Sequence, residues 1–131
     1  MIEQYIPRLI KDLDLGNISL ASGTPGIFTL PIREGVGVNI SDIPNGFVLK
    51  STIIPFPKTQ EEFFASRAML ANLFGQGTHG AVLGLSPDTN MLTLTQTVDY
   101  PFDYKEFKEI LEDFINTVDF WYDEALSIKQ K

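Results

Sequence analysis

The sequence lacks cysteine and contains one histidine among its 131 residues. The absence of cysteine excludes disulfide bonds, thiolate metal ligands and cysteine nucleophiles, and it suits a reducing compartment. No apolar run approaches the ~20 residues that a membrane-spanning helix needs, and the N-terminus lacks the basic start and apolar core of a signal peptide. We therefore expect a cytoplasmic protein with no membrane insertion and no bound metal.

Basic residues are also scarce, because ten Lys and Arg stand against seventeen Asp and Glu, giving a net charge of −7. Such a surface repels phosphate backbones, so we expect no nucleic-acid partner. Apolar residues are abundant at 44%, with ten phenylalanines. A chain of this length can bury a substantial core, and we expect one domain that spans residues 1–131.

The first half of the chain changes its hydrophobic period once. Apolar residues three and four apart predict a helix over residues 2–13, in which Pro7 lies either in the first turn or at a kink. A period of two then predicts about three strands between residues 18 and 55. Turn sequences such as Pro44-Asn45-Gly46 separate these strands, so they are expected to form an antiparallel meander.

The second half adds two helices and a hairpin. A helix is predicted over 61–74 after a capping box at 59–62, and strands over 81–85 and 91–98 are expected to pair. A second capping box opens the longest helix, expected over 103–126. The predicted fold is α+β, with an antiparallel twisted sheet of about five strands and three helices in the order α-β-β-β-α-β-β-α.

Residues 75–80 (GQGTHG) satisfy the dinucleotide fingerprint G-x-G-x-x-G and contain His79. That fingerprint binds phosphate only where a strand precedes the glycines and a helix follows them. Here the order is reversed, and the adjacent helix end carries a partial negative charge. We interpret the segment as a helix stop and chain reversal. His79 has no nucleophile motif to serve, and the acidic residues of the last helix read as a solvated face, so no catalytic residue and no cofactor is predicted.

The helix over 61–74 has two apolar faces, one with Phe63, Leu70 and Phe74, and one centred on Phe64 and Ala68. Such a helix needs two partners, its own sheet and something else. The strands also carry more large apolar residues than a small one-layer sheet can hide. This surplus indicates either dimerisation or capture of a peptide by strand addition; the alternative is a well-filled core.

The second half resembles the class I type III secretion chaperones, the Tir-chaperone-like group. The resemblance covers residues 59–126, whereas residues 1–57 match in element order alone. The matching features are the end of a helix, a glycine-bearing turn, a short strand, a Leu-x-Leu strand and an aromatic-bearing C-terminal helix: Leu70 to Asn72, Gly75 to Gly80, Ala81 to Leu85, Leu92 to Leu94, and Phe114 to Trp121.

This resemblance implies a bacterial cytoplasmic homodimer that is not an enzyme. It would bind the N-terminal chaperone-binding segment of a secreted effector and keep it soluble and secretion-competent. Effector contacts are expected on the sheet and first helix, at Ile6, Ile10, Val36, Val38, Ile40, Phe47, Leu49, Ile53, Ile54 and Phe56. The dimer interface is expected at Phe63, Arg67, Leu70, Phe74, Gly77, Ala81 and Leu83.

Two other readings stay open at this point. The aromatic content also suits a small-molecule-binding or enzymatic α+β domain with a pocket between sheet and helices. A chaperone-like adaptor for another secretion apparatus, or a regulator, would share every feature given above.

Overall fold

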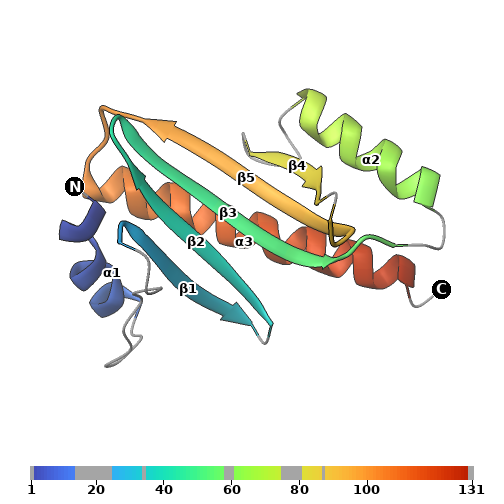
Figure 1. Ribbon diagram of the computed structural model, residues 1–131, viewed down its shortest axis with the longest axis horizontal. Helices are drawn as coiled ribbons and strands as arrows, with labels where there is room; N and C mark the ends of the chain where they lie inside the picture. The colour runs from blue at the N-terminus through green and yellow to red at the C-terminus, as the bar shows by residue number, and fades with distance from the viewer. Residues whose placement is uncertain are drawn as a thin grey trace.

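The computed structural model describes residues 2–13, 25–33, 35–57, 61–74, 81–86 and 88–129. Its order of elements confirms the predicted α-β-β-β-α-β-β-α arrangement (Figure 1). The elements are the 3₁₀ turn η1 (Ile2–Gln4), α1 (Ile6–Asp12), β1 (Ile27–Arg33), β2 (Val36–Ile43), β3 (Gly46–Pro55), α2 (Glu61–Phe74), β4 (Val82–Leu85), β5 (Met91–Asp99) and α3 (Tyr104–Lys129).

The five strands form one antiparallel sheet in the order β1-β2-β3-β5-β4. The predicted meander of β1, β2 and β3 and the predicted hairpin of β4 and β5 are both confirmed. The long pairing of β3 with β5 joins these two units, from Gly46 opposite Asp99 to Pro55 opposite Met91. This order leaves β1 and β4 as the outer strands of the described sheet (Figure 1).

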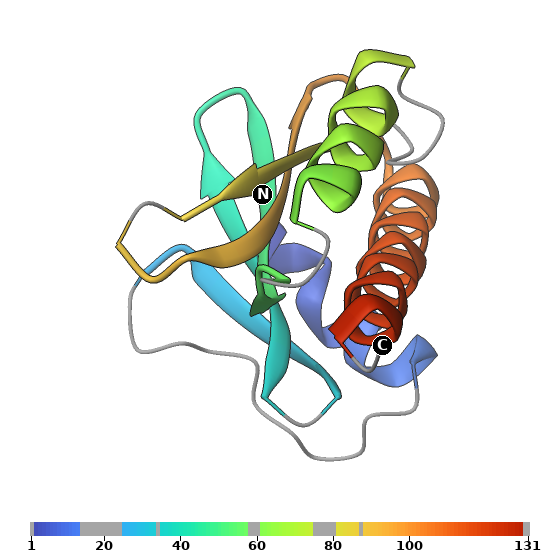
Figure 2. The same ribbon diagram turned by 90° about the vertical axis from the view of Figure 1, so that its right-hand side faces the viewer.

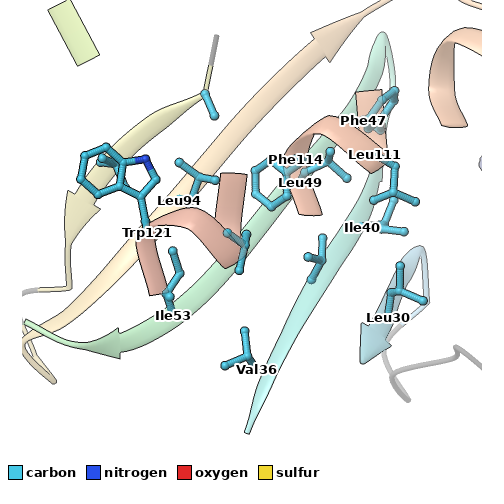
Figure 3. Packing of buried hydrophobic residues seen from close by; sticks show 14 of the residues in the cluster. Leu30, Val36, Ile40, Phe47, Leu49, Ile53, Leu94, Leu111, Phe114 and Trp121 are labelled. Atoms are coloured by element: carbon cyan, nitrogen blue, oxygen red, sulfur yellow. The ribbon is translucent and has the colours of Figure 1, made fainter. Parts of the chain in front are cut away.

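Helix α3 lies across one face of the sheet, and α2 lies on the same side (Figure 2). The strand residues that alternate toward α3 and the apolar stripe of α3 bury each other, as Figure 3 shows for Leu49, Phe114 and Trp121. Ser51 is the buried polar side chain within this strand pattern, and its hydroxyl donates to the carbonyl of Gly37 over 2.8 Å. The surplus of apolar strand residues therefore fills a core, which was the alternative reading of the sequence.

The start of α3 confirms the predicted capping box. The Glu106 N–H donates to the Asp103 carboxylate over 2.8 Å, and the Asp103 N–H donates to the Glu106 carboxylate over 3.3 Å. The helix ends at Lys129, three residues beyond the expected end. The capping box predicted at 59–62 and the glycine turn at 75–80 lie outside the described residues or overlap their boundary.

Helix α1 packs against the beginning of α3. Pro7 lies in its first turn, which confirms one of the two predicted positions, because the missing N–H has no partner there in any case. The Tyr104 hydroxyl donates to the Asp12 carboxylate over 2.7 Å, and the Arg8 guanidinium lies 4.1 Å from the Tyr104 ring centre. The ring of Tyr5 lies 5.5 Å from that of Tyr104.

This contact should make stability depend on alkaline pH. Burial, followed by the hydrogen bond to Asp12, raises the pKa of Tyr104 from 10.0 to about 12. The folded protein holds this proton more tightly than the unfolded chain, so the stabilisation is complete below pH 10.0 and is lost as pH rises toward 12. We expect urea denaturation to show a steeper loss of stability across this window for the wild type than for Tyr104→Phe. Parallel pH profiles of the two proteins would contradict this assignment.

Candidate protein-interaction site

Exposed large apolar side chains gather on α2 and β4. Of the six among the described residues, three lie on α2 and two on β4, whereas the sixth lies on α3: Phe63, Met69 and Leu70; Val82 and Leu85; Phe120. Met69 is the most exposed of them, at 71%. Exposed apolar side chains gathered on two neighbouring elements mark a candidate site of protein association.

Helix α2 has the two apolar faces that the sequence predicts. Phe64 is fully buried, with its ring edge-on to Phe56 at 5.3 Å and to Trp121 at 5.9 Å. The next residue along the chain, Phe63, turns the other way and is 56% exposed. Arg67 lies one turn farther along and pairs with Glu124 of α3 at 2.7 Å. Both the buried Phe64 and the ion pair of Arg67 therefore fix α2 to α3, while the side chains of Phe63 and Leu70 remain exposed.

A shallow apolar hollow of about 220 Å³ separates α2 from β4. Met69 and Ala65 of α2 line one side, and Leu83 and Leu85 of β4 line the other. Asn72 bridges the two elements, because its side-chain amide donates to the Leu83 carbonyl over 2.9 Å and its side-chain oxygen accepts from the Leu83 N–H over 2.7 Å. Of the exposed apolar residues of α2 and β4, Met69 and Leu85 line this hollow.

Strand β1 forms the opposite edge of the sheet. Its last residue, Arg33, places its guanidinium 4.0 Å from the ring centre of Tyr122 on α3 and within 3.5 Å of the carboxylates of Asp119 and Asp123. Pro31 lies in this strand, where its missing N–H is tolerated because an edge strand bonds on one side. Arg33 thus anchors the end of the β1 edge to the far half of α3.

The backbone groups of Thr29 point away from the sheet. The Asp42 N–H donates to the Gly26 carbonyl over 2.8 Å, which makes these two residues a bonded pair. Bonded and non-bonded pairs alternate along an antiparallel ladder. Thr29 is opposite Asn39 and falls on a non-bonded pair, so its N–H and C=O face the side where an added strand would lie.

The residues predicted to contact an effector are mostly in the core. Eight of the ten are buried: Ile6, Val36, Val38, Ile40, Phe47, Leu49, Ile53 and Ile54. The prediction that these eight side chains form an exposed surface is wrong, because they belong to one core cluster that the sheet shares with α1, α2 and α3. Ile10 and Phe56 are half-buried and pack at the border of the core. Two side chains of β1, Phe28 and Ile32, are also half-buried against the core and were not predicted as contact residues.

The residues predicted for the dimer interface divide differently. Phe63, Arg67 and Leu70 are exposed, as the prediction requires. Ala81 and Leu83 are buried at 3% and 5%, so their assignment to the surface is wrong. Their strand alternates, and it is the opposite face of β4 that points outward. The side chain of Phe74 and the whole of Gly77 lie outside the described residues.

Four exposed apolar residues are not among the predicted contact residues: Met69, Val82, Leu85 and Phe120. A period of two through residues 81–85 was the signal for Val82, because it faces away from Ala81 and Leu83. No comparable signal marked Phe120, which lies beside the apolar stripe of α3.

Residues 9–122 match the family model of the Tir chaperone protein (CesT) family. The protein belongs to the Tir chaperone family. A Chlamydia pneumoniae protein designated CPj0713/CpB0740 is 28% identical over 123 residues, which span 92% of this chain and 93% of that protein. The resemblance read from residues 59–126 is therefore confirmed, and the match extends into the first half of the chain.

Solved structures show the same fold as this Tir chaperone family member. One chain of the ExsC–ExsE complex has a TM-score of 0.74 at 16% identity. The alignment covers 95% of the present chain and 92% of the ExsC–ExsE chain. One chain of the HopA1–SchA chaperone–effector complex has a TM-score of 0.67 at 12% identity, with 93% of each chain covered. One chain of the heterodimeric ExoU–SpcU complex from the Pseudomonas aeruginosa type III secretion system has a TM-score of 0.65 at 13% identity, with 98% of this chain and 97% of that one covered.

Two other kinds of site can be addressed within the described part of the chain. No three His, Asp or Glu side chains there are grouped so that they could hold a metal ion. No helix there is both long enough and apolar enough to cross a bilayer.

Proposed function

We propose that this Tir chaperone family member is a cytoplasmic bacterial chaperone for a type III secretion effector. It binds the effector's N-terminal chaperone-binding segment and keeps the effector soluble and secretion-competent. The observation that carries the proposal is the family match over residues 9–122, on a fold shared with chains of chaperone–effector complexes. In this proposal the whole chain acts as one domain that performs no chemistry and uses no cofactor.

The effector segment is proposed to lie along β1 and α1. A disordered segment pays a large entropic cost when it is ordered, so it needs main-chain hydrogen bonds and apolar contacts over a long path. Strand addition at an open edge supplies both. The outward backbone groups of Thr29 and the half-buried side chains of Phe28 and Ile32 lie on β1, and α1 carries the half-buried Ile10. The half-buried Phe56 lies by α2 and belongs to a different region of the surface.

The chaperone is further proposed to be a homodimer that meets through α2 and β4. Support comes from the outward face of α2, where Phe63, Arg67 and Leu70 follow one another at helical spacing. Met69 is exposed on the flank of α2 that lines the hollow, and Val82 is exposed on β4. A symmetric interface of this kind would cover large side chains that the core of one chain leaves in water.

Co-expression tests the function. N-terminal segments of the secreted proteins encoded beside this chain should co-purify with it as stable complexes, and segments from the remainder of those proteins should not. Failure of every N-terminal segment to co-purify would overturn the proposal.

A proline at position 29 tests the edge at which the segment binds. Thr29→Pro removes the outward N–H and should weaken binding of a co-purified segment by about tenfold, the equivalent of one hydrogen bond. Thr29→Val keeps the N–H and is the matched control, expected to bind as the wild type does. Titration calorimetry measures both affinities. Equal weakening by the two variants would assign the effect to the side chain and contradict strand addition at β1.

The small-molecule alternative is less well supported. The hollow between α2 and β4 holds about 220 Å³, below the roughly 300–1,000 Å³ of typical ligand pockets. Among its lining residues Asn72 carries the main polar side chain, and both ends of that amide are already bonded to Leu83. The site therefore suits an apolar side chain of a protein partner better than a specific small molecule.

A further inference from the structure

The two outer strands of the sheet are not equivalent. On β4 the backbone N–H and C=O of Leu83 are both bonded to the side-chain amide of Asn72, over 2.7 and 2.9 Å. On β1, no described side chain bonds to both the backbone N–H and the backbone C=O of Thr29 as Asn72 does to Leu83. One sheet edge is thus capped from within the chain, and no described residue caps the other edge in this way.

The Asn72 contact reproduces what a neighbouring strand would do. Leu83 lies opposite Leu94 of β5, and because its N–H and C=O bond to Asn72 they point away from β5. A strand added to β4 would place one residue at this point, donating to that carbonyl and accepting from that N–H. The carboxamide of Asn72 supplies the same donor and the same acceptor in the same arrangement.

The capped position is the centre of a short and apolar edge. Strand β4 has four residues, and Val82 and Leu85 expose large apolar side chains on it. An exposed apolar edge with unpaired backbone groups is a template for unwanted strand pairing, which natural proteins suppress by short strands, charges or covering groups. No Lys, Arg, Asp or Glu lies in β4. Among the described residues, the strand is protected by its shortness and by the cover that Asn72 supplies.

We propose that Asn72 is a specificity-determining residue that closes β4 to strand addition. A partner that approaches α2 and β4 must then pack on side chains, whereas an extended segment is directed to β1. The inference rests on the proposed chaperone function for its biological meaning, because Asn72 would decide at which sheet edge an extended effector segment binds. Its chemistry depends on Asn72 and Leu83 alone.

Amide hydrogen exchange tests the first step. In the wild type the Leu83 amide should exchange slowly although β4 has no second neighbour in the described sheet, and in Asn72→Ala it should exchange about tenfold faster, as expected for loss of one hydrogen bond. Thr97→Ala, on the exposed polar face of β5, is the control and should leave Leu83 unchanged. Equally slow exchange of Leu83 in Asn72→Ala would overturn the proposal.

A synthetic strand tests the second step. The probe is a capped heptapeptide of alternating valine and threonine, added in excess, and its position is read from NMR shifts of the chaperone amides. It should shift Leu83 and Leu85 in Asn72→Ala but not in the wild type. The same peptide N-methylated throughout cannot pair and should shift neither residue. Fast exchange of Leu83 without a probe-induced shift would show Asn72 to be merely structural and would overturn the proposal.

A second variant guards against loss of folding. Asn72→Ser has a shorter side chain that does not span the two backbone groups of Leu83, so it should behave as Asn72→Ala does. Because the probe is not an effector, these results are independent of the co-expression test. If no effector segment co-purified but the heptapeptide shifted Leu83 in Asn72→Ala alone, the chaperone function would be rejected. The proposal that Asn72 closes β4 to strand addition would still stand.

Discussion

Phe64→Ala is expected to lower the free energy of unfolding by about 3–5 kcal/mol, the range for removing a fully buried aromatic side chain. Phe64 is fully buried, and its ring joins Phe56, just after β3, to Trp121 of α3. Truncation leaves a cavity at the point where α2 meets the sheet and α3. The loss should appear in urea denaturation as a lower midpoint with an unchanged slope.

The adjacent phenylalanine supplies the matched control. Phe63 is 56% exposed, so Phe63→Ala should change the stability of the single chain by no more than about 0.5 kcal/mol. Because dimerisation adds a stabilisation that depends on protein concentration, both variants should be unfolded at several concentrations. Equal losses for the two variants at the lowest concentration would contradict the assignment of opposite faces.

Leu70→Asp is expected to separate the proposed dimer into monomers. Leu70 lies in the exposed row of α2, and a carboxylate there would be buried without a partner in a symmetric interface. A hot-spot side chain contributes about 2 kcal/mol or more to an interface, and with Leu70 in that role the dissociation constant should rise by at least about 30-fold. Sedimentation velocity across a concentration series measures this change.

Thr97→Asp adds the same charge at an exposed position of β5 and should leave the association unchanged. A wild-type protein that sediments as a monomer at all concentrations would contradict the proposed dimer. A dimer that persists in Leu70→Asp would place the interface elsewhere on the chain.

The sequence predicts the elements of this fold because each has its own local signal. The stripe from Phe107 to Trp121 has helical spacing, and the strands alternate with a period of two, so type and order could be read without the structure. The capping box at Asp103 located the start of α3 for the same reason, since both of its bonds join residues three apart.

Exposure could not be read in the same way. An apolar face is equally apolar whether a helix of the same chain or another protein covers it. Val38 and Leu49 were assigned to a partner because nothing local shows that α3, some sixty residues later, lies over them. The pairing of β3 with β5 is similarly non-local.

The interaction site was therefore predicted in part. The outward row of α2 was found because a helix with two apolar faces contains one face too many for a single sheet. Asn72 was noted as part of a family pattern, but its two bonds to Leu83 depend on the arrangement of α2 beside β4. A side chain that imitates a strand has no signature in the residues around it.

The anchor at Arg33 has a further consequence for how tightly a segment can be held. With its guanidinium between Tyr122 and two carboxylates of α3, the end of β1 is fixed before any partner arrives. A segment that pairs with β1 then loses its own conformational entropy but does not also pay to order the strand that receives it. The edge is preorganised, so differences in affinity between one segment and another should appear mainly in their dissociation rates.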